Sequence, residues 1–192
     1  MVMSFFDETK NFGLMAMIAG LVMVLSAILW VVDGFDLGLI GVLIAGLLLL
    51  IFGLGVYQGE SKLNIGSLFD EGVTSKFGLV VAFIIIVGVI GIVQGIFALN
   101  IMSIVVGVLL ILFGFLMKMD LSPILEKIIW IILLIVFLLG IIINGILSVV
   151  GAFGGEPLGI VLNVLNAVAY LVIYIMLFLY MLSPEVKSRM SM

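Results

Sequence analysis

The sequence contains no cysteine and no histidine. Without cysteine, the chain cannot form disulfides, thiolate zinc sites or cysteine-ligated iron–sulfur clusters. Without histidine, it lacks the commonest haem and metal ligand and the most frequent general base. Isolated serines and tyrosines are the only candidate nucleophiles that remain. We therefore expect no catalytic residue, no metal and no cofactor, and predict that the protein is not an enzyme.

Charge is also scarce. Of 192 residues, 9% are charged and 66% are hydrophobic, whereas about a quarter of the residues in a typical soluble domain are charged. The mean hydropathy is +1.61. The seven Lys and Arg residues are scattered singly and form no basic patch for nucleic acid. These values exclude a soluble domain and make the lipid bilayer the expected partner.

What the sequence does contain is long uncharged runs. Residues 13–32 carry no charge, and as a helix they are about 30 Å long, the thickness of the hydrocarbon core of a bilayer. The runs do not alternate polar and apolar residues as barrel strands would. The predicted spans are 13–32, 38–57, 77–98, 101–117, 128–150 and 158–182. Residues 77–117 need a reversal, placed at Ala98-Leu99-Asn100, because one helix of that length would be about 60 Å long.

The charges follow this map. All seven cations fall in the N-terminus, in the connectors 58–76 and 118–127, or in the residues after the last span. The other three connectors hold only acids: Asp33, Asp36 and Glu156. The positive-inside rule then places both termini and the two basic connectors in the cytoplasm. We predict an all-α, polytopic integral membrane protein, a single domain over 1–192, with six transmembrane helices as three parallel hairpins in a prokaryotic cytoplasmic membrane.

The polar segments carry weaker predictions. Ser67-x-x-Asp70 would cap a short surface helix in the 58–76 connector, which could also dock a soluble partner. Ser122-Pro123 is typical of a helix start. Residues 1–11 are expected either to lie along the membrane interface or to fray, and residues 185–192 to form a short polar tail.

Parts of the chain resemble one another. Phe12-Gly13-Leu14 is echoed by Phe77-Gly78-Leu79, and Phe52-Gly53 by Phe113-Gly114. Gly41-Val42-Leu43-Ile44, within the run from Gly38 to Gly46, is echoed by Gly107-Val108-Leu109-Leu110, within the run from Ile104 to Leu110. On these last two runs the chain resembles the HdeD-like (DUF308) membrane proteins, which are built from tandem two-helix units with glycine-rich second helices. The resemblance implies a role in envelope stress or acid resistance and assigns no functional residue.

Few polar residues fall within the predicted spans, and none of them is ionised. Asn163, Asn166, Tyr170 and Tyr174 follow one another at spacings of three and four on the sixth span and therefore share one face of a helix. They form a possible polar intramembrane stripe, which either lines a cavity or binds a lipid headgroup. Alternatively, the amides hold the bundle together through hydrogen bonds to Gln94 or Asn144.

Small residues recur four apart on several spans, as is typical of closely packed membrane helices. The pairs are Ala16/Gly20, Gly41/Ala45, Gly91/Gly95 and Ser103/Gly107. Trp30 and Trp130 lie near span ends, as interface anchors do.

These patterns leave two functions open. The first is a non-enzymatic structural or accessory role, as a small envelope protein or a subunit of a larger membrane complex, with a second copy or other membrane subunits as partners. The alternative is a channel or carrier for a neutral or apolar small solute. It would need a continuous cavity bordered by Asn163, Asn166, Tyr170 and Gln94.

Overall fold

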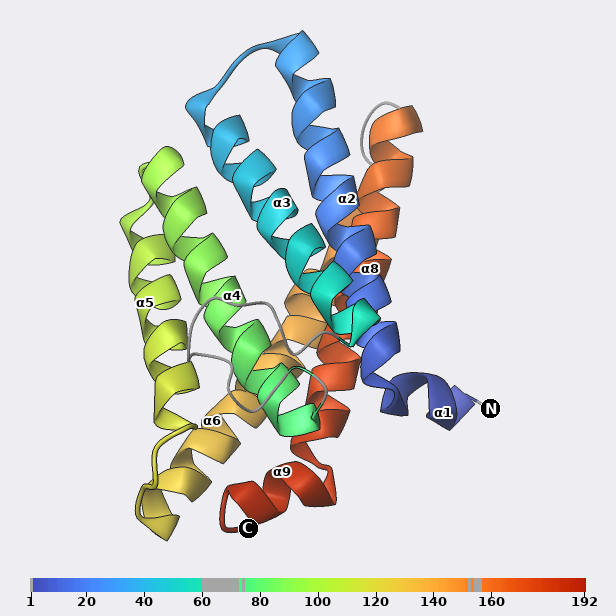
Figure 1. Ribbon diagram of the computed structural model, residues 1–192. Coiled ribbons are helices and arrows are strands. Elements are labelled where there is room, and N and C mark those ends of the chain that lie inside the picture. Colours follow the sequence, from blue (N-terminus) through green and yellow to red (C-terminus); the bar gives the residue numbers. More distant parts are fainter. Residues whose placement is uncertain (1, 60–72, 74, 152, 154–156) are drawn as a thin grey trace.

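In the computed structural model, all regular structure of the described residues is helical (Figure 1). The structure describes residues 2–59, 73, 75–151, 153 and 157–192. The predicted helix around Ser67-x-x-Asp70, and with it the docking surface for a soluble partner, lies outside the described residues. The bounds are α1 Val2–Asp7, α2 Thr9–Asp33, α3 Leu37–Gln58, α4 Lys76–Phe97, α5 Ile101–Leu116, α6 Pro123–Gly140, η2 Ile141–Leu147, α7 Ser148–Gly151, α8 Pro157–Met181 and α9 Pro184–Arg189.

Five helical segments are long and apolar enough to cross a membrane: α2, α3, α4, the continuous rod from α6 through α7, and α8. The sixth apolar helix, α5, has 16 residues, and its length of about 24 Å is less than the hydrocarbon thickness of about 30 Å. Each segment matches one predicted span to within a few residues. The largest difference is the fifth, which begins at Pro123 because the helix tolerates Glu126 and Lys127 in its first turns.

Local sequence explains where the helices begin. Asp36, Ser75 and Asn100 each precede a helix, and their side chains accept hydrogen bonds from backbone N–H groups at Gly38, Gly78 and Ser103. Ser122 also occupies a cap position before Pro123, but its side chain makes no capping hydrogen bond.

The predicted reversal at residues 98–100 is confirmed. α4 ends at Phe97 and α5 begins at Ile101. Leu99 turns the chain with a left-handed φ of 52° and is 89% exposed. Glycine adopts this left-handed conformation with the least strain, but the position is occupied by leucine, so the turn has none of the glycine that usually marks such a reversal in a sequence.

Helices adjacent in sequence also pack together in space. α2 packs along α3 (the first pair), α4 along α5 (the second pair), and the α6–η2–α7 rod along α8 (the third pair). α3 contacts α4, and α8 contacts both α2 and α4. The turn between α2 and α3, the turn between α4 and α5 and the beginning of α8 lie toward one end of the molecule, and both chain termini lie toward the other (Figure 1).

An aromatic cluster joins the pairs in the half of the bundle nearest the termini. Phe12 of α2 packs edge-on against Phe83 of α4, with ring centroids 5.2 Å apart. Phe52 of α3 and Tyr180 of α8 complete the cluster at 6.2–6.5 Å. All four side chains are at least 98% buried, so the centre of this half is filled.

The C-terminal residues were predicted to form a short polar tail. They form α9, and Val186 within it and Met190 directly after it are buried in the core. The Glu185 carboxylate accepts a hydrogen bond from the Phe77 N–H, 3.1 Å away, at the start of α4. The polar residues of this segment suggested a tail, but they lie on one side of an amphipathic helix whose apolar side packs on the bundle.

The N-terminal residues form α1, which packs on α2 and α8. Asp7 pairs with Lys76 at the start of α4, and the Asn11 amide donates to the Phe5 carbonyl at 3.0 Å. These contacts hold α1 against the bundle and count against a frayed end.

Candidate functional site

The first and second pairs are held together by backbone contact. A methyl group at Gly20 of α2 would lie 2.5 Å from the Leu50 nitrogen and 2.6 Å from the Gly46 oxygen of α3. In the second pair, a methyl group at Gly88 would lie 2.6 Å from the Gly107 oxygen. No side chain fits at these crossings, so the pairs contain no space for a ligand there.

The glycines at the contacts recur seven apart, which is close to two helical turns and keeps them on one face. The four pairs are Gly13/Gly20, Gly46/Gly53, Gly88/Gly95 and Gly107/Gly114. This spacing was present in the sequence and was missed, although the pairs spaced by four include several of the same residues. Gly41 and Gly107, which occupy equivalent positions in two similar stretches of sequence, have different surroundings. Gly41 faces Phe97 and Gln94 of α4, whereas Gly107 contacts the Gly88 backbone.

The third pair is built differently. A methyl group at Gly140 would lie 2.3 Å from the ring of Tyr174, and one at Gly145 would lie 2.5 Å from the Leu171 side chain. Here side chains of α8 fill the positions that backbone occupies in the other pairs, so the helices are separated by side chains.

A π-helical segment lies at the same place. η2 interrupts the rod between α6 and α7, and the Ser148 hydroxyl donates to the Ile143 carbonyl, 3.1 Å away. Within η2, the Asn144 amide donates to the Tyr174 hydroxyl at 3.4 Å. Such segments often mark functional sites in helices.

The stripe predicted on the sixth span lies on α8 as one face. The rings of Tyr170 and Tyr174 are stacked, with centroids 6.4 Å apart. The Tyr170 hydroxyl donates to the sulfur of Met23 on α2 at 3.3 Å, and Tyr174 is hydrogen-bonded to Asn144.

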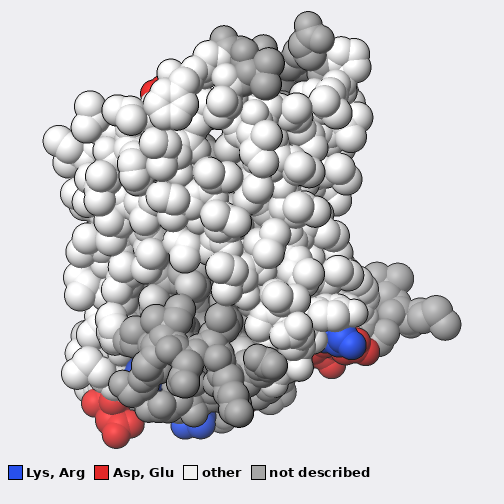
Figure 2. Space-filling view, turned by 45° about the horizontal axis from the view of Figure 1, so that its top comes forward, with Lys and Arg blue, Asp and Glu red and all other residues white. Residues whose placement is uncertain are grey.

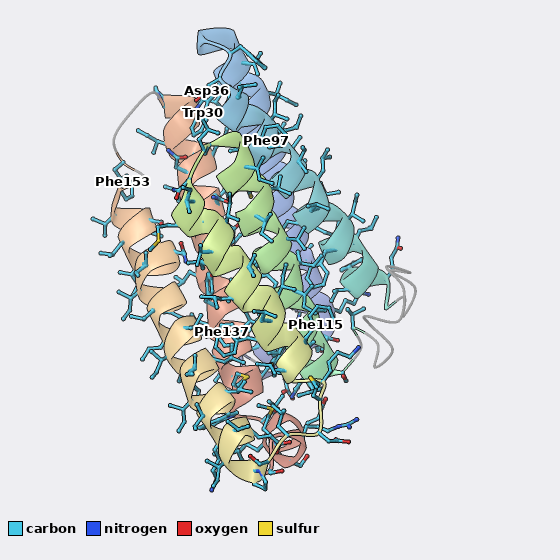
Figure 3. The ribbon with its side chains drawn as sticks, turned by 90° about the vertical axis from the view of Figure 1, so that its left-hand side faces the viewer. Trp30, Asp36, Phe97, Phe115, Phe137 and Phe153 are labelled. Carbon is cyan, nitrogen blue, oxygen red and sulfur yellow. The ribbon has the colours of Figure 1, made fainter. Side chains whose placement is uncertain are left out.

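A cavity of about 360 Å³ opens between α8 and the η2–α7 segment, and its volume is within the usual range of small-molecule sites. It is lined by Asn144, Ser148, Gly151, Asn163, Asn166, Ala167 and Tyr170. In Figure 3 the α6–η2–α7 rod stands at the left edge of the view, below the labelled Phe153, and α8 packs beside it. The cavity thus brings together Asn163, Asn166 and Tyr170 with Asn144. Its lining also includes Ser148, which sequence reasoning had not singled out.

One cavity residue is not satisfied by the protein. The Oδ1 atom of Asn166 is buried and accepts no hydrogen bond from the described residues. Buried amide oxygens in folded proteins are almost always hydrogen-bonded, so among the described residues this acceptor stands out as available to a donor that they do not supply.

Gln94 lies elsewhere. It is on α4, where its Cα would be 3.3 Å from a methyl group at Gly41 of α3, and it does not line the cavity. After Tyr170, α8 carries Ile173, Met176 and Leu177, which are fully buried and do not line the cavity.

Other hollows have different linings. A groove of about 270 Å³ between α4 and α5 is lined by apolar residues, two glycines and Ser103. Among the described residues no group of three or more acidic, cysteine or histidine side chains is placed to hold a metal ion.

In the part of the chain that the structure describes, the fold is helical, and five of its helices are long and apolar enough to cross a membrane. No protein-family model, no curated protein and no solved structure matches the chain.

Proposed function

We propose that the chain is a six-span protein of a prokaryotic cytoplasmic membrane, with α5 as its shortest span, three parallel hairpins and both termini in the cytoplasm. The distribution of charge supports this orientation. On the face shown in Figure 2, the blue cations lie toward one end of the molecule and the middle carries no charge. In the chain, Lys10, Lys76, Lys118 and Lys187 lie close to helix ends near the termini.

We propose a non-enzymatic structural or accessory role, either as a small envelope protein or as a subunit of a larger membrane complex. The observation that carries it is the backbone-to-backbone packing of α2 with α3 and of α4 with α5, which makes four of the six helices a rigid scaffold. Membership of the HdeD-like family, and the envelope-stress role that it implies, stays a prediction.

The experiment is to measure the mass of the native assembly after gentle solubilisation and to identify the chains that co-purify. The expected result is a defined oligomer or a complex with other membrane subunits. A monomer without partners at native expression levels would contradict the accessory role.

A carrier for a neutral small solute is the second candidate, and the uncharged cavity of the third pair favours it. The full burial of Ile173 and Leu177, which follow Tyr170 on α8 and do not line the cavity, favours an occluded site over an open pore. Flux of neutral solutes into liposomes, compared between the native chain and an Asn166→Leu variant, tests this candidate. Equal flux in both would exclude the cavity as the route.

A further inference from the structure

The cavity of the third pair has the chemistry of a binding site for an uncharged group. Every described residue that lines it is uncharged, so an ion placed there would lose its hydration without gaining a counter-charge from these residues. The lining nevertheless holds three amides and two hydroxyls. The ligand class that fits such a lining is neutral and rich in hydrogen-bonding groups.

The hydrogen bonds within the protein indicate that the ligand carries a hydrogen-bond donor. The Tyr170 hydroxyl donates to Met23, the Ser148 hydroxyl to Ile143 and the Asn144 amide to Tyr174. Asn166 Oδ1, in contrast, is a buried acceptor without a partner. A ligand hydroxyl satisfies this acceptor, whereas an ether or ester group brings no donor.

The surroundings of the cavity indicate that the ligand also has an apolar body. Asn144 and Asn163 are exposed along the groove, and several side chains within three residues of them in sequence are large, apolar and exposed. These are Ile143, Ile146, Leu147, Val161 and Leu165. A group entering from the side of the helix pair therefore meets apolar surface on both walls before it meets the amides.

The depth of the site agrees with this picture. Asn166 is nine residues after Pro157, the first residue of α8, or about 14 Å along a helix of about 37 Å. This is the level at which the headgroup of a lipid with little polar bulk would have to enter the hydrocarbon layer. The residues that follow Tyr170 on α8, namely Ile173, Met176 and Leu177, are fully buried and lie outside the cavity lining.

We propose that the cavity between η2 and α8 binds the free hydroxyl headgroup of an uncharged lipid, of the diacylglycerol type. In this complex the lipid hydroxyl donates to Asn166 Oδ1, and its acyl chains lie against the exposed apolar residues that flank the groove. The site retains lipid and does not conduct it. This binding is additional to the accessory role proposed above.

The test is equilibrium binding to the purified full-length protein in detergent, followed by native mass spectrometry, with dioleoylglycerol as the probe. Triolein, which has acyl chains but no free hydroxyl, and glycerol, which has hydroxyls but no chains, are the comparison ligands. We expect a one-to-one complex with dioleoylglycerol and at least ten-fold weaker binding of the other two, because each lacks one half of the recognised chemistry.

Two variants test whether the lipid binds in the cavity. Asn166→Leu removes the acceptor and is expected to weaken dioleoylglycerol binding at least ten-fold, and Asn163→Leu, at the exposed rim, to weaken it several-fold. Gln94→Leu is the matched control, since it replaces an amide on α4 outside the cavity and should leave binding within two-fold. A thermal unfolding curve confirms that each variant is folded. If the Asn166→Leu variant is not folded, the binding measured with Asn163→Leu tests whether the cavity is the site.

Three results would overturn the proposal. Equal binding of triolein would mean adsorption to apolar surface, and equal binding of glycerol would mean a free polyol site. Unchanged affinity in a folded Asn166→Leu or Asn163→Leu variant would remove the cavity as the site. Each leaves the native assembly mass unaffected, so the accessory role and the lipid site fail independently.

Discussion

The first two helix pairs and the third solve the same packing problem in different ways. In the first pair, Gly20 and Gly46 let the two backbones touch, and Gly88 and Gly107 do so in the second pair. In the third pair, Gly140 and Gly145 receive the side chains of Tyr174 and Leu171. Beside the backbone contact of the second pair there is a groove of about 270 Å³ with a mostly apolar lining, whereas the third pair, separated by side chains, holds a cavity of about 360 Å³ with a polar lining. The difference separates a scaffold from a region that can hold a ligand.

The strongest way to break this comparison is to add a methyl group at a backbone contact. Gly20→Ala is expected to destabilise the fold by about 3 kcal/mol, because the new Cβ would lie 2.5 Å from a backbone nitrogen that cannot move alone. Denaturant unfolding in detergent measures the change. Gly159→Ala is the control, since a Cβ there meets nothing within 4 Å, and its stability should not fall.

A smaller effect is expected in the third pair. Gly140→Ala should cost about 1–2 kcal/mol, because the Tyr174 ring can shift away from the new methyl group. Adding Tyr174→Leu should recover most of this loss. The corresponding double change in the first pair, Gly20→Ala with Leu50→Ala, should recover nothing, because the clash there involves the Leu50 main chain. Recovery in both pairs, or in neither, would remove the distinction between them.

The two tryptophans sharpen the same contrast. Trp130 of α6 donates its indole N–H to the Met181 carbonyl, 2.8 Å away at the end of α8. Trp130→Phe should therefore cost about 1 kcal/mol of unfolding free energy through the lost hydrogen bond. Trp30 is 48% exposed, and Trp30→Phe should change stability by less than about 0.5 kcal/mol. Similar losses for both would show that the hydrogen bond does not help to join α6 to α8.

The smallest expected effect is a gain. Leu99 adopts a left-handed conformation in the tight turn of the second pair, which costs a non-glycine residue about 1–2 kcal/mol. Leu99→Gly should raise the unfolding free energy by about 1 kcal/mol, since part of the relief is offset by the greater freedom of glycine in the unfolded chain. A loss of stability would mean that the Leu99 side chain makes a stabilising contact.

Much of the fold could be predicted from local patterns. The uncharged runs mark the helices because a charge inside such a run is costly to bury, and Asn100 marks a turn because it is the polar residue near the middle of a run too long for one helix. The residues 185–192 could not be assigned in this way. Their polar residues are local, whereas burial of Val186 and Met190 depends on contact with distant helices.

The candidate site was predicted in part. Spacings of three and four were enough to place Asn163, Asn166, Tyr170 and Tyr174 on one face of a helix. Which residues oppose that face depends on how the helices pack. The structure places Asn144 there through η2 and leaves Gln94 beside Gly41, and periodicity alone could not distinguish these two amides.

The sequence by itself therefore determined that the chain is helical and highly apolar, where its helices lie, and that their apolar runs carry no charge. These properties follow from composition and from regular spacing along a single helix. The tertiary structure decided which glycines touch, that the C-terminal residues dock, and that a polar cavity lies in the third pair. Those depend on the distance between helices, which is set by the side chains that happen to face one another.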